Sequence, residues 1–342
     1  MTSRLAASLL LTAACLPAGA LDIQLNATPG MDAQALAGFQ MAASYWEARL
    51  TDSVQVNINI GFQTLSPGVL GQAGSETTVI SVFDYFTALT ADSTTSYDTL
   101  AIGNLPPISG FGGLSFLTQT DTEGGSALVS LDNDDSGNNA WLSLNTANAK
   151  ALGLFSGTGS DASITFSDVF SWDFDSSDGV GAGLQDFVGV AIHEMGHALG
   201  FTSGVDTVDY AVGVPQDLEI FAIFSGLDMF RYSANAQPGQ LDLAAGGTPY
   251  FSLDGGATNL GFFSTGSDLG DGNQASHWKD GLALGIMDPT ANPAGQTNTP
   301  TTLDKIAFDV IGWDVDYNAV PEPSSLLAAA LGMLLIAGRR RR

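Results

Sequence analysis

The three histidines of the chain are the residues whose types and spacing could do chemistry. Two of them stand four apart in the segment His193–His197 (HEMGH), and the third, His277, follows far downstream. Residues four apart on a helix share one face, so His193 and His197 can reach the same ion. A zinc ion with three protein ligands keeps one position open and lowers the pKa of a water there to about 7. We therefore predict a zinc centre, with Glu194 as the general base that takes the proton of the attacking water.

The third ligand distinguishes the classes of zinc site. The compact metzincin pattern places a histidine six residues after the second one, but Ser203 occupies that position, and a hydroxyl is a poor zinc ligand. Thermolysin-like sites use a glutamate about twenty residues downstream, and Glu219 follows His197 by 22 residues. His277 is the better candidate, because the chain uses histidine nowhere else and all three histidines are therefore expected to bind one metal.

Apolar patterns predict the elements that must position these residues. The segment 183–199 is predicted to be a largely buried helix, because little of its surface is polar, and Gly200 follows as a natural stop. A looser second lobe is expected after this helix. We expect further helices at 32–50, 77–90 and 302–313, and strands at 54–60, 127–131 and 162–166.

The N-terminus is predicted to be a processing signal rather than part of the fold. Residues 1–20 combine a basic residue, an apolar run and a small-x-small site that ends at Ala20, as in a secretory signal peptide. The only cysteine, Cys15, lies within it, so the mature protein would contain no thiol. A lipoprotein signal at Cys15 is the alternative.

The C-terminus resembles the PEP-CTERM sorting signal of Gram-negative bacteria. It contains Pro-Glu-Pro at 321–323, an apolar run at 326–338 and four arginines at 339–342. The run is short of the roughly 20 residues of a membrane span, and the arginines would hold its end on the cytoplasmic side. The resemblance implies export through the inner membrane, transient anchoring by the tail, and an exosortase-type sorting enzyme as partner. It also implies a final location at the cell surface or in the extracellular matrix.

The charge balance argues against nucleic acid as a partner. Arg4 and Arg339–Arg342 account for five of the ten Lys and Arg residues, and Glu322 for one of the 36 acids. The segment between the two signals therefore has 35 acids against five bases, and it would repel phosphates. Calcium binding, or simple solubility, accounts better for this excess of acids.

Three further motifs point to a known class of zinc enzyme. The segments 193–201 (HEMGHALGF), 276–278 (SHW) and 286–289 (IMDP) resemble the leishmanolysin-type metzincins, in which an insertion precedes the third histidine. With 227–233 and 250–256, and with the tail, the chain resembles the PEP-CTERM-sorted bacterial zinc metalloproteases. The resemblance implies that zinc is bound by His193, His197 and His277, that Glu194 is the base, and that Met287 forms a turn beneath the metal.

Supporting residues are harder to rank from the sequence. Metal-bound histidines usually donate their other N–H to a neighbouring acceptor, often a carboxylate. Candidates for that carboxylate are Asp206, Asp280 and Asp288, and candidates for a tyrosine that stabilises the transition state are Tyr210, Tyr232 and Tyr250. Acidic loops beginning at Asp132, Asp173 and Asp268 are candidates for calcium, with solvated turns as the alternative.

Together these observations predict a two-lobed α+β zincin of the metzincin type, with the histidine helix at the floor of a cleft. We expect a signal peptide at 1–20, a catalytic domain at 21–318 and a sorting signal at 319–342. The lobes would meet between residues 200 and 201. The predicted function is a secreted zinc endopeptidase that acts on protein or peptide substrates. The alternative is a non-catalytic metal-binding protein of the surface or biofilm matrix.

Overall fold

The computed structural model describes residues 20–119, 128–212 and 217–319, which form a mixed α+β protein, as the sequence predicts. The predicted signal peptide, with Cys15, lies outside the described residues. So does the predicted sorting tail after Ala319. No helix in the described part of the chain is long and apolar enough to cross a membrane.

A four-stranded sheet supports the histidine helix. Its strand order is β1-β2-β8-β3. The pairs β1–β2 and β2–β8 are parallel, whereas β3 runs antiparallel to β8 at the end of the sheet. Alternate residues of β2 (Val56, Ile58, Ile60) are buried, as predicted for that strand. The bounds are β1 (Asp22–Ala27), β2 (Gln55–Phe62), β8 (Ala162–Phe166) and β3 (Gly71–Ser75).

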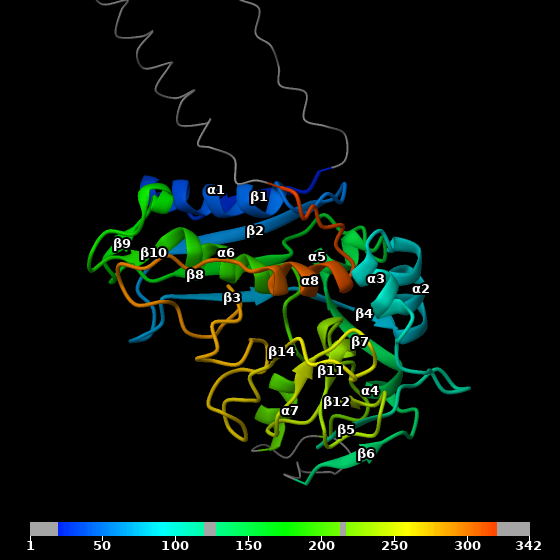
Figure 1. Ribbon diagram of the computed structural model, residues 1–342. Helices are drawn as coiled ribbons and strands as arrows, with labels where there is room; N and C mark the ends of the chain where they lie inside the picture. The colour runs from blue at the N-terminus through cyan, green and yellow to red at the C-terminus, as the bar shows by residue number, and fades with distance from the viewer. Residues whose placement is uncertain (1–19, 120–127, 213–216, 320–342) are drawn as a thin grey trace, which may run out of the picture.

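Two helices pack side by side against this sheet. They are α1 (Ala33–Glu47) and α6 (Phe187–Ala198), which carries two of the histidines (Figure 1). The indole Nε1 of Trp46 in α1 donates a 3.1 Å hydrogen bond to the carbonyl of Ile192 in α6. Rings of α1, β8 and α6 are also in contact, namely Phe39, Phe166 and Phe187. The histidine helix is therefore fixed on two sides by a continuous apolar core.

Short strands gather below the main sheet in Figure 1. They form one sheet of order β11-β13-β14 and another of order β12-β5-β6, and β4 pairs with β7. The pair of β9 and β10 lies apart from them, beside the main sheet. The parallel pair of β5 and β12 joins residues from both sides of the expected boundary at 200/201, so that boundary does not separate the strand pairing. The bounds are β4 (Thr77–Ser81), β5 (Phe116–Thr118), β6 (Ser130–Asp132), β7 (Trp141–Asn145), β9 (Trp172–Asp173), β10 (Gln185–Asp186), β11 (Arg231–Tyr232), β12 (Leu241–Asp242), β13 (Tyr250–Phe251) and β14 (Gly261–Phe262).

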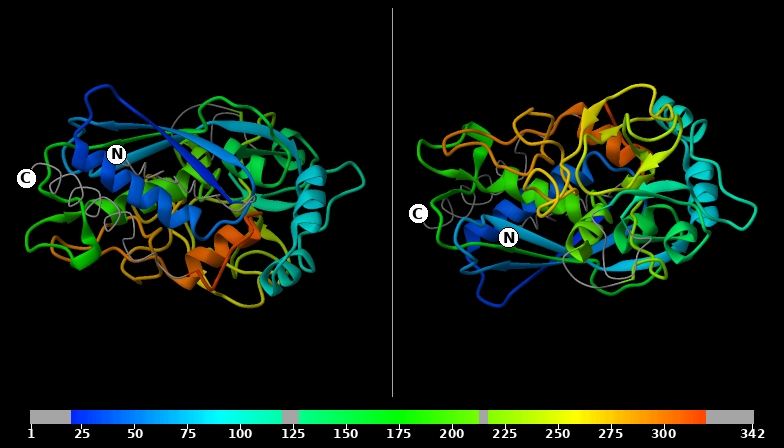
Figure 2. Two further views of the ribbon diagram at one scale, coloured as in Figure 1. Left: turned by 90° about the horizontal axis from the view of Figure 1, so that it is seen from above. Right: turned by 90° about the horizontal axis from the view of Figure 1, so that it is seen from below.

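The remaining helices are distributed around the sheets, with α8 near the centre of the view in Figure 1. Figure 2 shows α2 and α3 together at one end. The bounds are α2 (Val82–Asp92), α3 (Ser96–Ile102), α4 (Gly137–Ala140), α5 (Thr146–Ala151), α7 (Val205–Val212) and α8 (Thr302–Val310), with 3-10 turns at Ser176–Asp178 and Leu227–Phe230.

One predicted helix is partly wrong. The segment 77–90 begins as strand β4 and becomes helical only at Val82. Its first four residues are the β-branched run TTVI, and β4 pairs in antiparallel fashion with β7. The side chain of Ser81 then accepts a 3.0 Å hydrogen bond from the backbone N of Asp84, which starts the helix.

Other predicted elements are confirmed, most of them with shifted ends. The strand at 162–166 is β8, and the helix at 32–50 is α1. The histidine helix begins four residues later than predicted, because Asp186 caps it by accepting a 3.0 Å bond from the backbone N of Gly189. Gly200 follows this helix with a φ of 122°, a region that favours glycine. The helix predicted at 302–313 ends at Val310, and the strand predicted at 127–131 is found at Ser130–Asp132, with Ala127 outside the described residues.

Candidate metal centre

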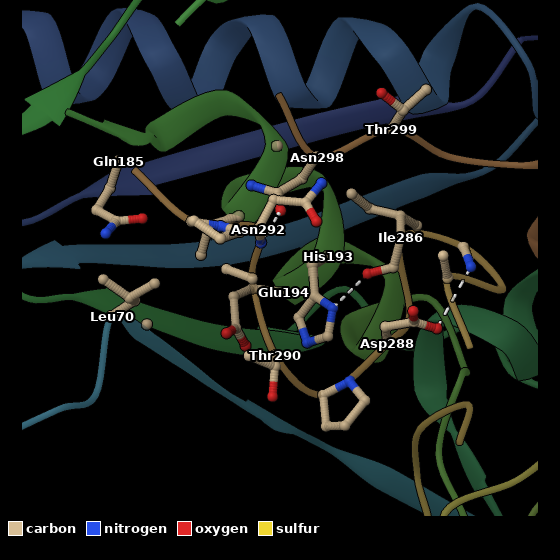
Figure 3. Close-up of a pocket in the computed structure, with 18 of the residues that line it drawn as sticks. Leu70, Gln185, His193, Glu194, Ile286, Asp288, Thr290, Asn292, Asn298 and Thr299 are labelled. Atoms are coloured by element: carbon tan, nitrogen blue, oxygen red, sulfur yellow. Dashed lines mark hydrogen bonds between the residues drawn. The ribbon is translucent and has the colours of Figure 1, made fainter. Parts of the chain in front are cut away.

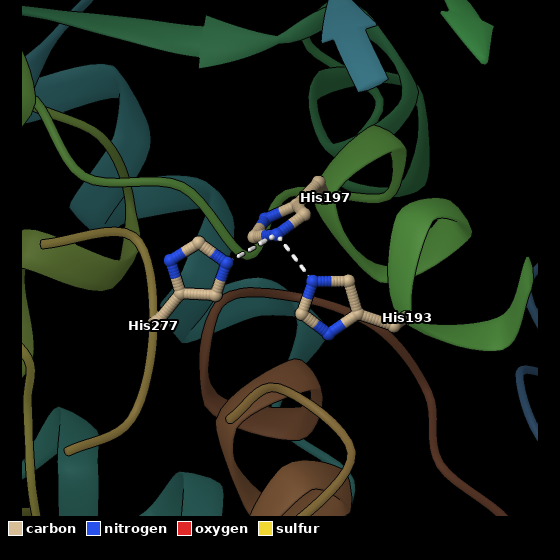
Figure 4. A group of neighbouring side chains, drawn as sticks. All are labelled: His193, His197 and His277. Carbon is tan, nitrogen blue, oxygen red and sulfur yellow. Dashed lines mark hydrogen bonds between the residues drawn. The ribbon is translucent and has the colours of Figure 1, made fainter. Parts of the chain in front are cut away.

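The three histidines meet, as the sequence predicts. The Nε2 atom of His197 lies 3.1 Å from Nε2 of His193 and 3.1 Å from Nε2 of His277. Figure 4 shows the three rings turned toward one common point. Zinc–nitrogen bonds of about 2.0–2.1 Å in a tetrahedral site place two donors about 3.3 Å apart. The observed spacing is therefore close to that of three ligands on one ion.

The hydrogen bonds of the other ring nitrogens fix the orientation of the rings. Nδ1 of His193 lies 2.7 Å from the carbonyl oxygen of Ile286, and Nδ1 of His197 lies 2.7 Å from that of Phe201. Nδ1 of His277 lies 3.2 Å from the carbonyl oxygen of Gln274. A carbonyl oxygen only accepts, so each Nδ1 must carry the proton. In the neutral rings each Nε2 then has a free lone pair, and three such lone pairs facing one another suit a cation.

Burial favours the neutral form of these rings. Burial and the neighbouring His193 lower the pKa of His277 to about 3. The pKa values of His193 and His197 are also lowered, with burial as the largest cause. Neutral imidazole is the form that binds a metal ion, so the environment keeps the donors available.

Glu194 lies beside the histidines and is buried, with 7% of its surface exposed. Burial raises the pKa of its carboxyl to about 8. The positive charge of a bound ion would favour the ionised form again. A Cβ at Gly71, at the start of β3, would lie 3.2 Å from Oε1 of Glu194 and 2.7 Å from the ring of Phe166. The glycine therefore lets the edge strand approach the carboxylate closely.

Met287 lies beneath the histidine helix. It is fully buried, and a Cβ at Gly196 would stand only 2.5 Å from its Sδ atom. The backbone N of Trp278 donates a 3.0 Å bond to the carbonyl of Met287, so the segments after His277 and before Asp288 are tied together. The position agrees with the predicted turn below the metal ligands.

The buried Asp304 at the start of α8 holds this turn. Its carboxylate accepts hydrogen bonds from the backbone N of Ile286 at 2.9 Å and of Met287 at 3.3 Å. It also accepts a 2.8 Å bond from Nε1 of Trp278. Asp304 is not among the residues predicted from the sequence. The only local signal for it is the pattern Thr301-x-x-Asp304, which marks a helix start and gives no indication of the turn.

The predicted orienting carboxylates do not contact the imidazoles. Asp206 instead supports the backbone before His277, where it accepts from the N atoms of Ala275 at 2.5 Å and Ser276 at 3.2 Å. Asp288 accepts from the backbone of the loop at 284–285, and Asp280 is exposed. The imidazoles donate to backbone carbonyls instead of to these three carboxylates. Every residue has such a carbonyl, so its role could not be found in the sequence.

Two cavities flank the histidines along β3. One, of about 730 Å³, is lined by apolar residues and by the amides of Gln185, Asn292 and Asn298 (Figure 3). The other, of about 830 Å³, is lined mainly by small polar residues and includes His277. Five residues line both cavities, namely Val69, Gly71, His193, Glu194 and Pro289. His193 and Glu194 therefore lie where the two cavities adjoin.

Several alternative site residues lie elsewhere. Glu219 is grouped with Asp132 and Asp134 rather than with the histidines, so the thermolysin-like third ligand is wrong. That group could hold a metal of its own. Ser203 donates a 2.5 Å bond to the buried Asp228 and is not placed as a ligand. The tyrosines proposed for the transition state, Tyr210, Tyr232 and Tyr250, are absent from the described lining of both cavities.

The acidic loops at Asp173 and Asp268 make local contacts. Oδ1 and Oδ2 of Asp173 accept from the backbone N atoms of Asp175 and Gly181. The backbone N of Asp268 donates to Asp209, and Asp271 forms an ion pair with Lys279 at 2.7 Å. Among the described residues, neither loop belongs to a group of three close ligand side chains.

Comparison with protein families identifies the end of the chain. Residues 319–342 match the PEP-CTERM protein-sorting motif. The chain therefore carries a PEP-CTERM sorting motif at this end. Such a motif is recognised by exosortase-type enzymes, and it implies export across the inner membrane to the surface or exterior of a Gram-negative bacterium. No curated protein and no solved structure matches the chain.

Proposed function

We propose that this PEP-CTERM-sorted protein is a secreted zinc-dependent endopeptidase. The observation that carries the proposal is the convergence of three imidazole Nε2 atoms beside a buried glutamate. Three nitrogen ligands and one open position are the donor set of a catalytic zinc site, whereas structural sites use four protein ligands. His193, His197 and His277 would hold the ion.

Each group around the ion would have its own role in the hydrolysis. Zinc, when bound, would act as a Lewis acid. It would lower the pKa of its bound water to about 7 and polarise the carbonyl of the substrate. Glu194 accepts a proton from the attacking water at its carboxylate and passes it to the leaving amine. The carbonyls of Ile286, Phe201 and Gln274 hold the imidazoles in the protonation state that leaves Nε2 free.

The edge strand β3 offers a binding place for an extended peptide. It is the last strand of the main sheet, and Gly71, Gln72, Ala73 and Ser75 line the cavity that contains His277. An extended chain can add to such an edge through backbone hydrogen bonds, with its side chains directed into pockets. A peptide bound along β3 would pass Gly71 and bring one of its peptide bonds to Glu194.

The test compares the purified wild-type protein with Glu194→Gln. Both proteins should bind one equivalent of zinc, measured by elemental analysis after dialysis. Wild type should cleave casein, and the variant should be slower by about 10²–10⁴-fold, the usual contribution of a general base. Equal cleavage by the two proteins would contradict the role of Glu194. Zinc binding without any hydrolysis by wild type would favour the non-catalytic metal-binding protein instead.

A further inference from the structure

The third histidine differs from the other two in the kind of backbone that carries it. His193 and His197 lie on α6, where regular helical hydrogen bonds place them. His277 lies between β14 and α8, on a segment that belongs to no helix or strand (Figure 4). Its Nδ1 is 3.2 Å from its carbonyl partner, against 2.7 Å for each of the other two rings. The position of His277 therefore depends on contacts from neighbouring elements.

The carboxylate of Asp206 makes such contacts with the two residues before His277. Its Oδ1 accepts a 2.5 Å bond from the backbone N of Ala275, and its Oδ2 accepts from the backbone N of Ser276 at 3.2 Å. Oδ2 also accepts from the hydroxyl of Ser276. Asp206 belongs to the first turn of α7, so its own backbone is fixed by a helix. One carboxylate therefore holds the chain directly before the third histidine.

The hydroxyl of Ser276 links this contact to the segment between α6 and α7. It accepts a 2.8 Å bond from the backbone N of Ser203 and donates to Asp206. Ser203 and Ser276 are both buried, so these bonds are shielded from water. The same segment contains Phe201, whose carbonyl oxygen lies 2.7 Å from Nδ1 of His197. One short segment thus contacts the ring of the second histidine and the backbone beside the third.

Helix α7 carries a second carboxylate that holds the same loop farther from the metal centre. Asp209 follows Asp206 by three residues, so the two lie on one face of the helix. The oxygens of Asp209 accept from the backbone N atoms of Asp268 at 2.8 Å and of Leu269 at 2.7 Å. The two aspartates make the same kind of contact. Of the two, Asp206 is the one that contacts the residues directly before His277.

We propose that Asp206 is a positioning residue of the metal centre, which fixes His277 relative to His197. The inference rests on the zinc site of the proposed function, and it concerns metal binding rather than hydrolysis. Without this carboxylate, the backbone N atoms of Ala275 and Ser276 and the hydroxyl of Ser276 lose their acceptor. His277 is then no longer held with its Nε2 at 3.1 Å from that of His197. A group that orients a metal ligand typically contributes about 10–100-fold to metal affinity.

The zinc affinity of the full chain tests the proposal. Asp206→Asn keeps the size of the side chain but replaces one acceptor oxygen by an NH₂ group that faces N–H and O–H donors. After removal of zinc, the variant should bind added zinc about 10–100-fold more weakly than wild type, measured in competition with a chelator. Ser276→Ala removes the bridging hydroxyl and should weaken zinc binding in the same direction.

Asp209→Asn is the matched control, because it alters the same kind of contact on the same helix. Asp209 is 3% exposed, so the variant should melt at a lower temperature than wild type. Its zinc affinity should nevertheless equal that of wild type, since its partners Asp268 and Leu269 lie away from His277 in the loop. The comparison separates the position of the contact from its contribution to stability.

The absorption of bound cobalt gives a reading that a purely structural role would not change. The visible spectrum of Co²⁺ depends on the number and geometry of its ligands. His277→Ala, loaded with an excess of cobalt, provides the spectrum of a site without the third histidine. The spectrum of Asp206→Asn should change toward that of His277→Ala, whereas Asp209→Asn should keep the wild-type spectrum.

The outcomes distinguish this inference from the proposed peptidase activity. The inference is overturned if Asp206→Asn and Ser276→Ala both keep the wild-type zinc affinity and cobalt spectrum. It is also overturned if Asp209→Asn weakens zinc binding as much as Asp206→Asn does. If Asp206→Asn does not fold, Ser276→Ala decides by the same measurements. A wild type that binds zinc but does not cleave casein would contradict the peptidase and not the role of Asp206.

Discussion

The indole Nε1 of Trp278 donates a 2.8 Å hydrogen bond to Oδ1 of the buried Asp304. Trp278 follows the third histidine directly, and Asp304 also accepts from the backbone of Met287 beneath the histidine helix. One carboxylate therefore holds both the segment of His277 and the turn that supports the other two histidines. We therefore expect the position of His277, the third proposed ligand, to depend on this pair.

Trp278→Phe should loosen that connection. The variant keeps an aromatic ring but removes the N–H, so Asp304 loses one donor in a buried setting, at a cost of about 1–3 kcal/mol. The smaller ring also leaves a cavity at this fully buried position, which adds to the loss. We expect a lower free energy of unfolding in urea and weaker zinc binding in competition with a chelator. Trp141→Phe is the matched control, because Trp141 is 47% exposed and should tolerate the change. Equal behaviour of the two variants would contradict a supporting role for Trp278.

His277→Ala and Ser203→Ala should have different effects. Loss of His277 removes one of the three converging nitrogens, so the variant should not retain zinc through dialysis. Ser203→Ala should keep zinc, because its hydroxyl donates to Asp228 rather than to the site. The second variant should nevertheless melt at a lower temperature, since the buried Asp228 loses a donor worth about 1–3 kcal/mol. Zinc content by elemental analysis and thermal melts separate the two results, and the reverse pattern would refute the ligand assignment.

The sequence predicted the histidine site where local patterns carried the information. The helix of His193 and His197 follows from apolar periodicity and from the glycine after its end, and both features are present. The approach of His277 to the other two histidines was predicted because the chain contains only three histidines. The contacts that orient the rings could not be predicted, because they are backbone carbonyls of Ile286, Phe201 and Gln274.

Tertiary contacts explain what could not be predicted from local patterns. The segment 77–81 forms a strand because it pairs with β7, a partner more than sixty residues away that its own helical periodicity does not reveal. Gly71 and Asp304 are ordinary residues in their local sequence. Their importance arises from what the fold places beside them, which is Glu194 for the glycine and the turn at Met287 for the aspartate.

Gly71→Ala should disturb the centre without removing a ligand. The added Cβ would lie 2.7 Å from the ring of Phe166 and 3.2 Å from Oε1 of Glu194, so strand β3 or the carboxylate must shift. We expect a loss of about 1–3 kcal/mol in stability from overpacking, and a kcat/KM at least about tenfold lower on casein, with zinc content unchanged.

A control for this change exists on the same strand. A Cβ added at Gly74 would meet no other atom within 4 Å, so Gly74→Ala should leave both stability and cleavage close to wild type. If Gly71→Ala and Gly74→Ala behaved alike, close approach of β3 to Glu194 would not matter for the reaction.

The carboxylates around Asp92 should make the stability of the calcium-free protein depend on pH. Burial and the neighbours Asp314, Asp52, Asp98 and Asp309 raise the pKa of Asp92 to about 7. In the unfolded chain an aspartate titrates near about 3.9. Between these values the folded state binds a proton that the unfolded state does not, so stability falls as the pH rises from about 4 to 7. The asparagine of Asp92→Asn does not titrate, so the stability of this variant lacks the contribution of Asp92 to the pH dependence. The melting temperature of the variant minus that of wild type should therefore be smallest at pH 4.5 and should increase up to about pH 8, measured without calcium. A difference that stays constant over this range would contradict the raised pKa of Asp92.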